Sequence, residues 1–352
     1  MKRTDVRLAL VFKDFAAWIR TSCVGLNVAG YTTQKVLSEH GIETVVYPVR
    51  HNVDVVHSID RYNETHKVKL THVVISAPWM SGHDLRALLV HFPDIKFVVL
   101  SHSNVGFLQA DPGGVYLLRE YHKLAREFGN FKVGGNSKKF VDWLDQAYGD
   151  EAVLLPNLSP SGDPLEKSWS GGALKIGAFG AVRPEKNFMT AAAAAVAIQA
   201  ELGVPVELHM STGGEGDQGL TAPAIDQMCD GQIKVIRHPW MFWDGFIQLI
   251  ASMDLLIQVS YTESFNMVTA DGISVGVPSV VSPAIYWAPP EWKAEPDDAL
   301  DVASAGIRLL LDQEARNQGI EYLRAHNEDS LKYWERFLFG KKRSWLDRLF
   351  GD

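Results

Sequence analysis

The chain has 352 residues, of which 46% are hydrophobic and 22% charged, a composition typical of a globular protein with room for two ordinary domains. No apolar run approaches the roughly 18 residues that a membrane span requires, and the early charges Lys2, Arg3 and Asp5 do not fit a secretion signal. The net charge of −8 argues against a dedicated nucleic-acid binder. The two cysteines, Cys23 and Cys229, exclude a disulfide framework or a cysteine-rich metal site and fit a cytoplasmic location.

The first half of the chain alternates short, β-rich apolar runs with helical segments. The expected strands are 7–12, 44–49, 72–76, 96–101, 132–135 and 152–156, and the expected helices are 27–40, 82–92, 115–128 and 137–148. Alternation of this kind indicates a parallel, doubly wound sheet. We therefore assign residues 1–160 to an N-terminal Rossmann-like domain.

A passage rich in Ser, Gly and Pro, residues 157–172, is the best candidate for a linker, and the pattern restarts after it. The expected strands are 174–179, 206–210, 232–236, 254–260 and 279–282, and the expected helices are 187–202, 243–252, 298–311 and 315–328. This repetition predicts a second Rossmann-like domain, residues 171–329, which faces the first across a cleft.

The final segment, residues 330–352, mixes aromatic and basic residues. Its large apolar side chains are Trp334, Phe337, Leu338, Phe339, Trp345, Leu349 and Phe350. One interpretation is an amphipathic helix that makes a peripheral contact with a membrane surface. We favour a terminal helix that packs back on the N-terminal domain, because aromatic residues at this density need burial.

Two acidic residues mark the strand–helix–strand unit at 254–282. A predicted strand delivers Glu263 to the mouth of the sheet, and Asp271 follows eight residues later on the helix that begins there. Residues eight apart on a helix share roughly one face, so both acids would look into one crevice beside unpaired backbone N–H groups. That arrangement suits a ligand with hydroxyls and phosphates. The alternative is a surface capping acid on a solvated helix face.

Two cations mark the turn after the first strand of the second domain. Gly180 is followed by Arg183 and Lys186, directly before a predicted helix that starts at Asn187. Glycine permits close approach of a ligand, and Arg, Lys and the helix N-terminus together suit a diphosphate. The alternative is a solvated turn with two exposed cations.

Familiar cofactor and metal motifs are absent from the sequence. Neither Gly-x-Gly-x-x-Gly nor the Gly-x-x-x-x-Gly-Lys-Ser/Thr phosphate loop occurs, and we find no His-Glu-x-x-His and no Asp-x-Asp. The histidines show no spacing typical of metal ligands. We therefore expect neither a bound cofactor nor a metal.

Three motifs in the second half resemble retaining glycosyltransferases of the GT-B fold, of the family-four type that uses nucleotide sugars. They are Gly180-x-x-Arg183-x-x-Lys186-Asn187, then Ser260-x-x-Glu263-Ser-Phe, then Asp271 with Gly276-Val-Pro278 after it. The resemblance covers residues 171–285 well and the first half more loosely. It implies two Rossmann-like domains, and its second acid is usually Glu where this chain has Asp271.

The resemblance also implies a role for each matching position. Arg183 and Lys186 would neutralise the departing diphosphate, Glu263 would orient the sugar, and Asp271 would hold the ribose. His102, directly after a strand, would contact the sugar from the N-terminal domain, although a histidine in this position is otherwise most often structural. The remaining expected donor contacts are Gly25, Gly213, Gly214, Ile236, Arg237, Ser264, Phe265 and Asn266.

The acceptor side of the cleft is the least constrained part of this interpretation. Trp18, Trp79 and the loop 104–114, which begins at Asn104, are candidate acceptor contacts, although either tryptophan could equally belong to the core. A glycan, a lipid-linked sugar, a small metabolite or a modified DNA base remain open as hydroxyl acceptors. UDP-glucose is the commonest donor guess. A nucleotide-sugar epimerase and a non-catalytic binding module of the same fold are the alternatives to a transferase.

Overall fold

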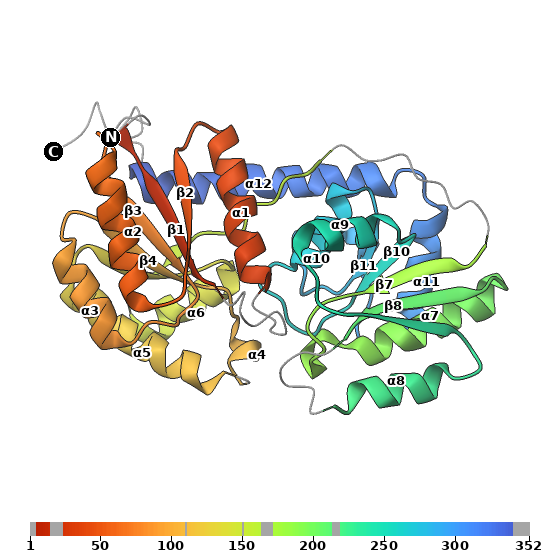
Figure 1. The fold of residues 1–352 in the computed structure, drawn as a ribbon. Helices are drawn as coiled ribbons and strands as arrows, with labels where there is room; N and C mark the ends of the chain where they lie inside the picture. The colour runs from red at the N-terminus through yellow and green to blue at the C-terminus, as the bar shows by residue number, and fades with distance from the viewer. Residues whose placement is uncertain are drawn as a thin grey trace.

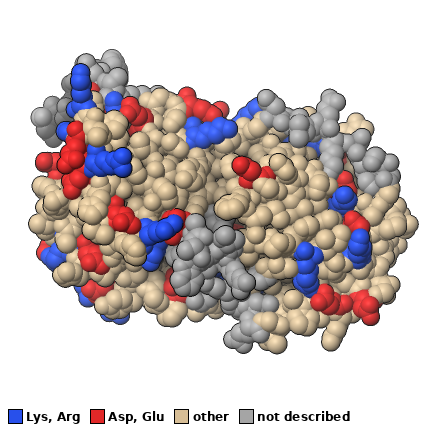
Figure 2. Space-filling view, in the orientation of Figure 1, with Lys and Arg blue, Asp and Glu red and all other residues tan. Residues whose placement is uncertain are grey.

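The computed structural model describes residues 5–14, 24–109, 111–149, 151–162, 172–212 and 219–340. They form two α/β domains that lie side by side (Figure 1). Trp18, Gly213 and Gly214 lie outside the described residues, as do Cys23 and the end of the chain from residue 341. On the face shown in Figure 2, the described Lys and Arg side chains are scattered among Asp and Glu rather than gathered into a basic groove.

The N-terminal domain contains a six-stranded parallel sheet in the order β2-β1-β3-β4-β5-β6. Its strands are β1 (Leu8–Lys13), β2 (Thr44–Val49), β3 (His72–Ser76), β4 (Lys96–Ser101), β5 (Phe131–Gly135) and β6 (Val153–Leu154). Its helices are α1 (Val24–Glu39), α2 (Asn52–Thr65), α3 (Gly82–His91), α4 (Val105–Leu108), α5 (Pro112–Glu127) and α6 (Lys138–Tyr148). Successive strand residues point to opposite faces of the sheet. Val73 and Val74, for example, belong to two separate buried clusters, so both faces are covered.

The C-terminal domain repeats this plan with a five-stranded parallel sheet in the order β11-β10-β7-β8-β9. Its strands are β7 (Leu174–Ala178), β8 (Val206–Ser211), β9 (Lys234–His238), β10 (Leu255–Gln258) and β11 (Ser279–Val281). Its helices are α7 (Phe188–Leu202), α8 (Thr221–Cys229), α9 (Trp243–Ala251), α10 (Met267–Ser274) and α11 (Ala299–Leu311), with short 3₁₀ turns η3 (Pro184–Lys186) and η4 (Pro290–Trp292). The predicted pair of parallel-sheet domains is confirmed.

One long helix, α12 (Ala315–Phe339), runs along both domains (Figure 1). Ile320 and Leu323 in its first half join the C-terminal core, whereas Leu331 and Trp334 in its second half join the N-terminal core. The Trp334 indole also donates to the Pro156 carbonyl at 2.9 Å.

The expected packing against the N-terminal domain is therefore confirmed for the described part of the C-terminal segment. The expected break near residue 329 is wrong, because one continuous helix spans 315–339. Trp345, Leu349 and Phe350 lie outside the described residues. Among the helices that the structure describes, none combines the length and the apolar character needed to cross a bilayer.

Candidate functional site

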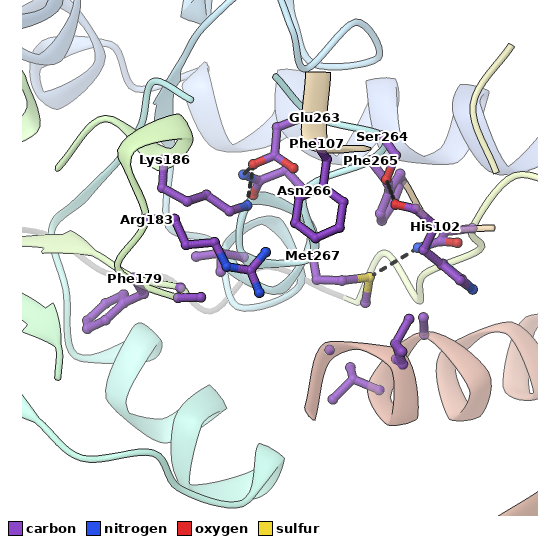
Figure 3. Close-up of a pocket in the computed structure, with 18 of the residues that line it drawn as sticks. His102, Phe107, Phe179, Arg183, Lys186, Glu263, Ser264, Phe265, Asn266 and Met267 are labelled. Atoms are coloured by element: carbon purple, nitrogen blue, oxygen red, sulfur yellow. Dashed lines mark hydrogen bonds and ion pairs between the residues drawn. The ribbon is translucent and has the colours of Figure 1, made fainter. Parts of the chain in front are cut away.

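A cleft of about 550 Å³ lies between the two domains, and its walls come from loops that follow strands of both sheets and from residues of α1, α4, α9 and α10. The carboxyl ends of parallel strands are the usual binding edge of such sheets. Twelve of the residues singled out from the sequence line this cleft: Gly25, Trp79, His102, Asn104, Gly180, Arg183, Lys186, Glu263, Ser264, Phe265, Asn266 and Asp271. Figure 3 shows how side chains from both domains converge on it.

Glu263 is held on one of its two oxygens. Its Oε1 accepts from the Ser260 hydroxyl at 2.8 Å and the Asn266 amide at 2.9 Å, and it pairs with Lys186 Nζ at 2.5 Å (Figure 3). The Glu263 side chain is 8% exposed. These contacts leave Oε2 without a donor among the described residues, so it is the oxygen available to a ligand hydroxyl.

Backbone conformation fixes the loops that carry this pair. The described non-glycine residues with positive φ are Ala77, Asn187 and Asn266, at or beside the cleft. The amide of Asn187, directly after Lys186, donates to Val259 and Pro296 carbonyls at 3.1 and 2.6 Å. Asn266 caps α10, because its Oδ1 accepts from the Thr269 N–H at 2.8 Å. Asparagine tolerates this region better than most residues, and such conformations cluster at functional sites.

Arg183 reaches across the cleft to the other domain. Its guanidinium lies 5.0 Å from the centre of the Phe107 ring, which belongs to α4 (Figure 3). This cation–π contact links the two domains across the cleft. Arg183 and Lys186 therefore place two cations on the C-terminal wall of one cleft.

His102 is fixed through both ring nitrogens. Nε2 lies 2.8 Å from the Ser76 hydroxyl, and Nδ1 lies 3.4 Å from the Asn136 amide nitrogen. Because an amide N–H₂ only donates, we assign Nδ1 as the acceptor and place the proton on Nε2. Burial lowers the pKa of His102 to about 4, so the imidazole is neutral at physiological pH.

Asn136 joins this histidine to the opposite domain. Its amide nitrogen also lies 3.3 Å from Asn157 Oδ1 and 3.2 Å from the Ser264 hydroxyl. Ser264 in turn donates to the His102 carbonyl at 2.9 Å. The Ser264 side chain is thus used in a contact between the two domains.

Asp271 sits at the back of the cleft wall and is 3% exposed. Its Oδ1 accepts from the Trp243 indole N–H at 3.1 Å. Burial raises the pKa of Asp271 to about 7, although the indole hydrogen bond opposes this effect.

Several expected contacts lie elsewhere. Ile236 and Arg237 do not line the cleft, and the Arg237 guanidinium instead donates to Asp226 on α8 at 2.5 Å. The next residue, His238, does line it and lies 2.9 Å from His209, Nε2 to Nδ1. Trp18, Gly213 and Gly214 lie outside the described residues.

Two of the candidate acceptor contacts, Trp79 and Asn104, are held by hydrogen bonds within the protein. The Trp79 indole donates to the Ser76 carbonyl at 3.1 Å, and its ring packs against the N-terminal core. Asn104 caps α4 by accepting from the Phe107 N–H at 3.0 Å.

Sequence reasoning missed Asn136 and Trp243, which also line the cleft, as does Phe107 from the expected acceptor loop 104–114. Asn136 follows β5 as His102 follows β4, so its position after a strand was a usable signal. Within the ranges that the structure describes, no three His, Cys, Asp or Glu side chains gather as a metal ion would need.

Comparisons with known proteins bear on the fold. No protein-family profile matches the chain, and no curated protein is similar to it in sequence. Solved structures are similar in shape. Sucrose-phosphate synthase from Thermosynechococcus elongatus matches with a TM-score of 0.64 and 14% identity, over 94% of this chain and 98% of that one.

Two further structures match over nearly the whole chain. A glycosyltransferase from Rickettsia africae gives a TM-score of 0.56 with 13% identity, over 94% of this chain and 99% of that one. A UDP-forming α,α-trehalose-phosphate synthase from Burkholderia xenovorans gives a TM-score of 0.56 with 11% identity, over 95% of this chain and 98% of that one. Together with the two parallel-sheet domains and the cleft between them, these likenesses show that the chain has the GT-B fold of glycosyltransferases.

Proposed function

We propose that this protein is a glycosyltransferase that moves a sugar from a nucleotide diphosphate-sugar to a hydroxyl acceptor, with retention and without a metal. The observation that carries the proposal is the meeting of Lys186, Arg183 and Glu263 in one cleft. Two cations suit a diphosphate, and a buried carboxylate with one available oxygen suits sugar hydroxyls.

The cations serve the leaving group. The Lys186 ammonium has three N–H donors, so it can keep its bond to Glu263 while it donates to a phosphate oxygen. Arg183 adds a second positive charge on the same wall. Negative charge grows on the diphosphate as the bond to the sugar breaks, and fixed cations in a cleft stabilise that charge without reorganisation.

The sugar would lie against Glu263, with Oε2 accepting from its hydroxyls. In the transfer, the bond from the anomeric carbon to the diphosphate oxygen breaks and a bond to the acceptor oxygen forms on the same face. The acceptor proton passes to the departing diphosphate. Neutral His102, held by Ser76 and Asn136, forms part of the wall from the N-terminal domain.

The structural neighbours favour a uridine nucleotide as the donor. One matching structure is a UDP-forming synthase, and another, a pneumococcal O-GlcNAc transferase with a TM-score of 0.52, was solved with UDP and GlcNAc. We therefore propose a UDP-linked hexose, with UDP-glucose as the first donor to test.

Nucleotide release in the presence of an acceptor panel tests the proposal. Lys186→Ala and Glu263→Ala should each lower turnover by at least about a hundredfold, the usual effect of losing one transition-state contact. Lys234→Ala is the matched control, because it breaks the Lys234–Glu207 ion pair of the same domain outside the cleft. Unchanged turnover in a folded Lys186→Ala or Glu263→Ala protein would refute the assignment.

Two other activities of the same fold are separated by the same assay. An epimerase would convert the donor without an acceptor, and the product would appear as an epimeric nucleotide sugar. A binding module would show nucleotide-sugar affinity but no nucleotide release with any acceptor. We expect release that depends on both the acceptor and Lys186.

A further inference from the structure

The carboxylate of Asp271 is directed at a tryptophan. The side chain was expected to hold the ribose, yet only 3% of the residue is exposed and Oδ1 accepts from the Trp243 indole at 3.1 Å. Trp243 itself lines the cleft. The bond to Asp271 therefore fixes one edge of an indole that is part of the cleft wall.

Packed helices hold the two partners in place. Trp243 is the first residue of α9, and Asp271 lies in the second turn of α10. Between these helices is a buried apolar cluster that includes Ile250 and Val277, with Phe246 and Val268 packed against it. Because both helices rest on this cluster, the indole–carboxylate bond has a fixed geometry rather than a chance surface position.

We propose that Asp271 is a positioning residue that holds the Trp243 indole as the surface against which the donor nucleoside packs, rather than a direct ligand of the ribose. This inference rests on the proposed function. An indole offers a flat apolar face that suits a nucleobase or the apolar side of a ribose.

The chemistry of the acid agrees with this role. A carboxylic acid oxygen accepts an indole N–H whether or not the group is ionised. A ribose diol is better bound by an ionised carboxylate, and burial holds the pKa of Asp271 near 7. The aspartate is also one methylene shorter than the glutamate that is usual in the resemblance, so its carboxylate reaches less far towards a ligand in the cleft.

Calorimetric binding of UDP provides the test. Asp271→Asn keeps an acceptor for the indole and should leave the Kd within about twofold of the parent. Asp271→Ala and Trp243→Phe should each raise the Kd by about tenfold. The double variant should bind about as weakly as either single variant, because both changes remove the same indole placement. Additive losses in the double variant would overturn the inference.

A second ligand distinguishes an indirect role from direct ribose binding. The ratio of the Kd values for UDP and 2′-deoxy-UDP should be the same in the parent and in Asp271→Ala. If Asp271 holds the ribose hydroxyls, this ratio must collapse toward one in Asp271→Ala, and the inference fails while the proposed function stands. If the parent protein binds neither UDP nor any other nucleoside diphosphate, the proposed function fails, and this inference with it.

A spectroscopic readout tests the contact itself. The indole N–H resonance that disappears in Trp243→Phe should shift in Asp271→Ala and stay close to its place in Asp271→Asn. Trp143→Phe is the matched control, because Trp143 packs against the N-terminal core and does not line the cleft. If the Trp243 resonance does not shift in Asp271→Ala, the hydrogen bond between Trp243 and Asp271 is absent in solution.

Discussion

Asn136 has a larger part in the cleft than its small side chain suggests. It is 1% exposed, and its one amide nitrogen faces His102, Asn157 and Ser264 at 3.2–3.4 Å. An amide nitrogen has two hydrogens, so it serves three acceptors by sharing. The residue fixes the tautomer of His102 and joins the two walls at a single point.

Removal of this amide should affect catalysis more than donor binding. In Asn136→Ala we expect kcat to fall by about tenfold, because His102 loses its fixed tautomer and Ser264 loses a partner, while the KM for the donor changes little. Nucleotide release measured over a range of donor concentrations separates the two constants.

Asn130→Ala is the control for this change. Its amide donates to three carbonyls in the same domain, those of Leu89, Phe92 and Ile95, and the residue does not line the cleft. The control should lose about 1–3 kcal/mol of stability with kcat unchanged. An equal loss of kcat in both variants would show that the effect of Asn136 is merely structural.

At the scale of elements, α12 connects the two domains because its two halves pack in different cores. Trp334 is 1% exposed and anchors the second half of the helix in the N-terminal core. Trp334→Ala should therefore cost about 3–5 kcal/mol of unfolding free energy, as expected for loss of a buried tryptophan. Urea denaturation of the purified variant measures this cost.

The neighbouring residue Arg336 provides the comparison for that experiment. It is exposed and lies on the same helix, so Arg336→Ala should change stability by no more than about 0.5 kcal/mol. A Trp334→Ala protein as stable as Arg336→Ala would mean that the second half of α12 does not pack as the structure has it.

The strands were predictable because each is a short apolar run that a glycine, proline or polar residue interrupts. Helices with weak apolar faces could not be predicted in this way. The helix α2 buries only Val55, Ile59 and Tyr62, and α8 buries only Ile225 and Cys229. Their i, i+4 spacing is present in the sequence, but few apolar residues carry it, so tertiary packing decides the helix.

The site was predictable where linear motifs carry it. Lys186 and Glu263 were placed together from local patterns, and they do meet. Arg237 was misplaced because successive strand residues face opposite ways, so Arg237 points to α8 while His238 points to the cleft. Phe107 and Asn136 could not be placed against the C-terminal domain, because their contacts depend on how the two domains sit together.

At the scale of the whole molecule, contacts of different kinds hold the domains around the cleft. The cation–π pair of Arg183 and Phe107 closes one part of it, and the Asn136–Ser264 hydrogen bond closes another. His326 of α12 lies 3.0 Å from the Asn157 carbonyl, and its ring centre lies 5.2 Å from that of Phe265, with the two rings tilted by 35°. The helix α12 and the cleft loops are therefore joined by direct contacts.

Stability should depend on pH in opposite directions on the two sides of pH 6.5. Burial lowers the pKa values of His72, His102 and His326 to about 4, so the unfolded chain binds more protons at these sites between pH 4 and 6.5. The free energy of unfolding therefore decreases at these sites as the pH falls from 6.5 to 4. Asp271 has the opposite sign, because its raised pKa of about 7 makes the folded state bind the extra proton between pH 4 and 7.

Over pH 4–6.5 the unfolded chain binds three more protons at the histidines and one fewer at Asp271, a net difference of two protons. The free energy of unfolding should therefore rise by about 3 kcal/mol per pH unit from these groups. Between pH 6.5 and 7 only Asp271 still differs between the two states, so the contribution of these groups to the free energy of unfolding should fall. Urea unfolding of the parent and of Asp271→Asn across this range isolates the acid, because the asparagine does not titrate. The parent should lose about 1.4 kcal/mol per pH unit relative to the variant up to pH 7 and then level off. A difference that stays constant across the range would mean that Asp271 ionises normally in the folded protein, and that its carboxylate is not buried there as the structure has it.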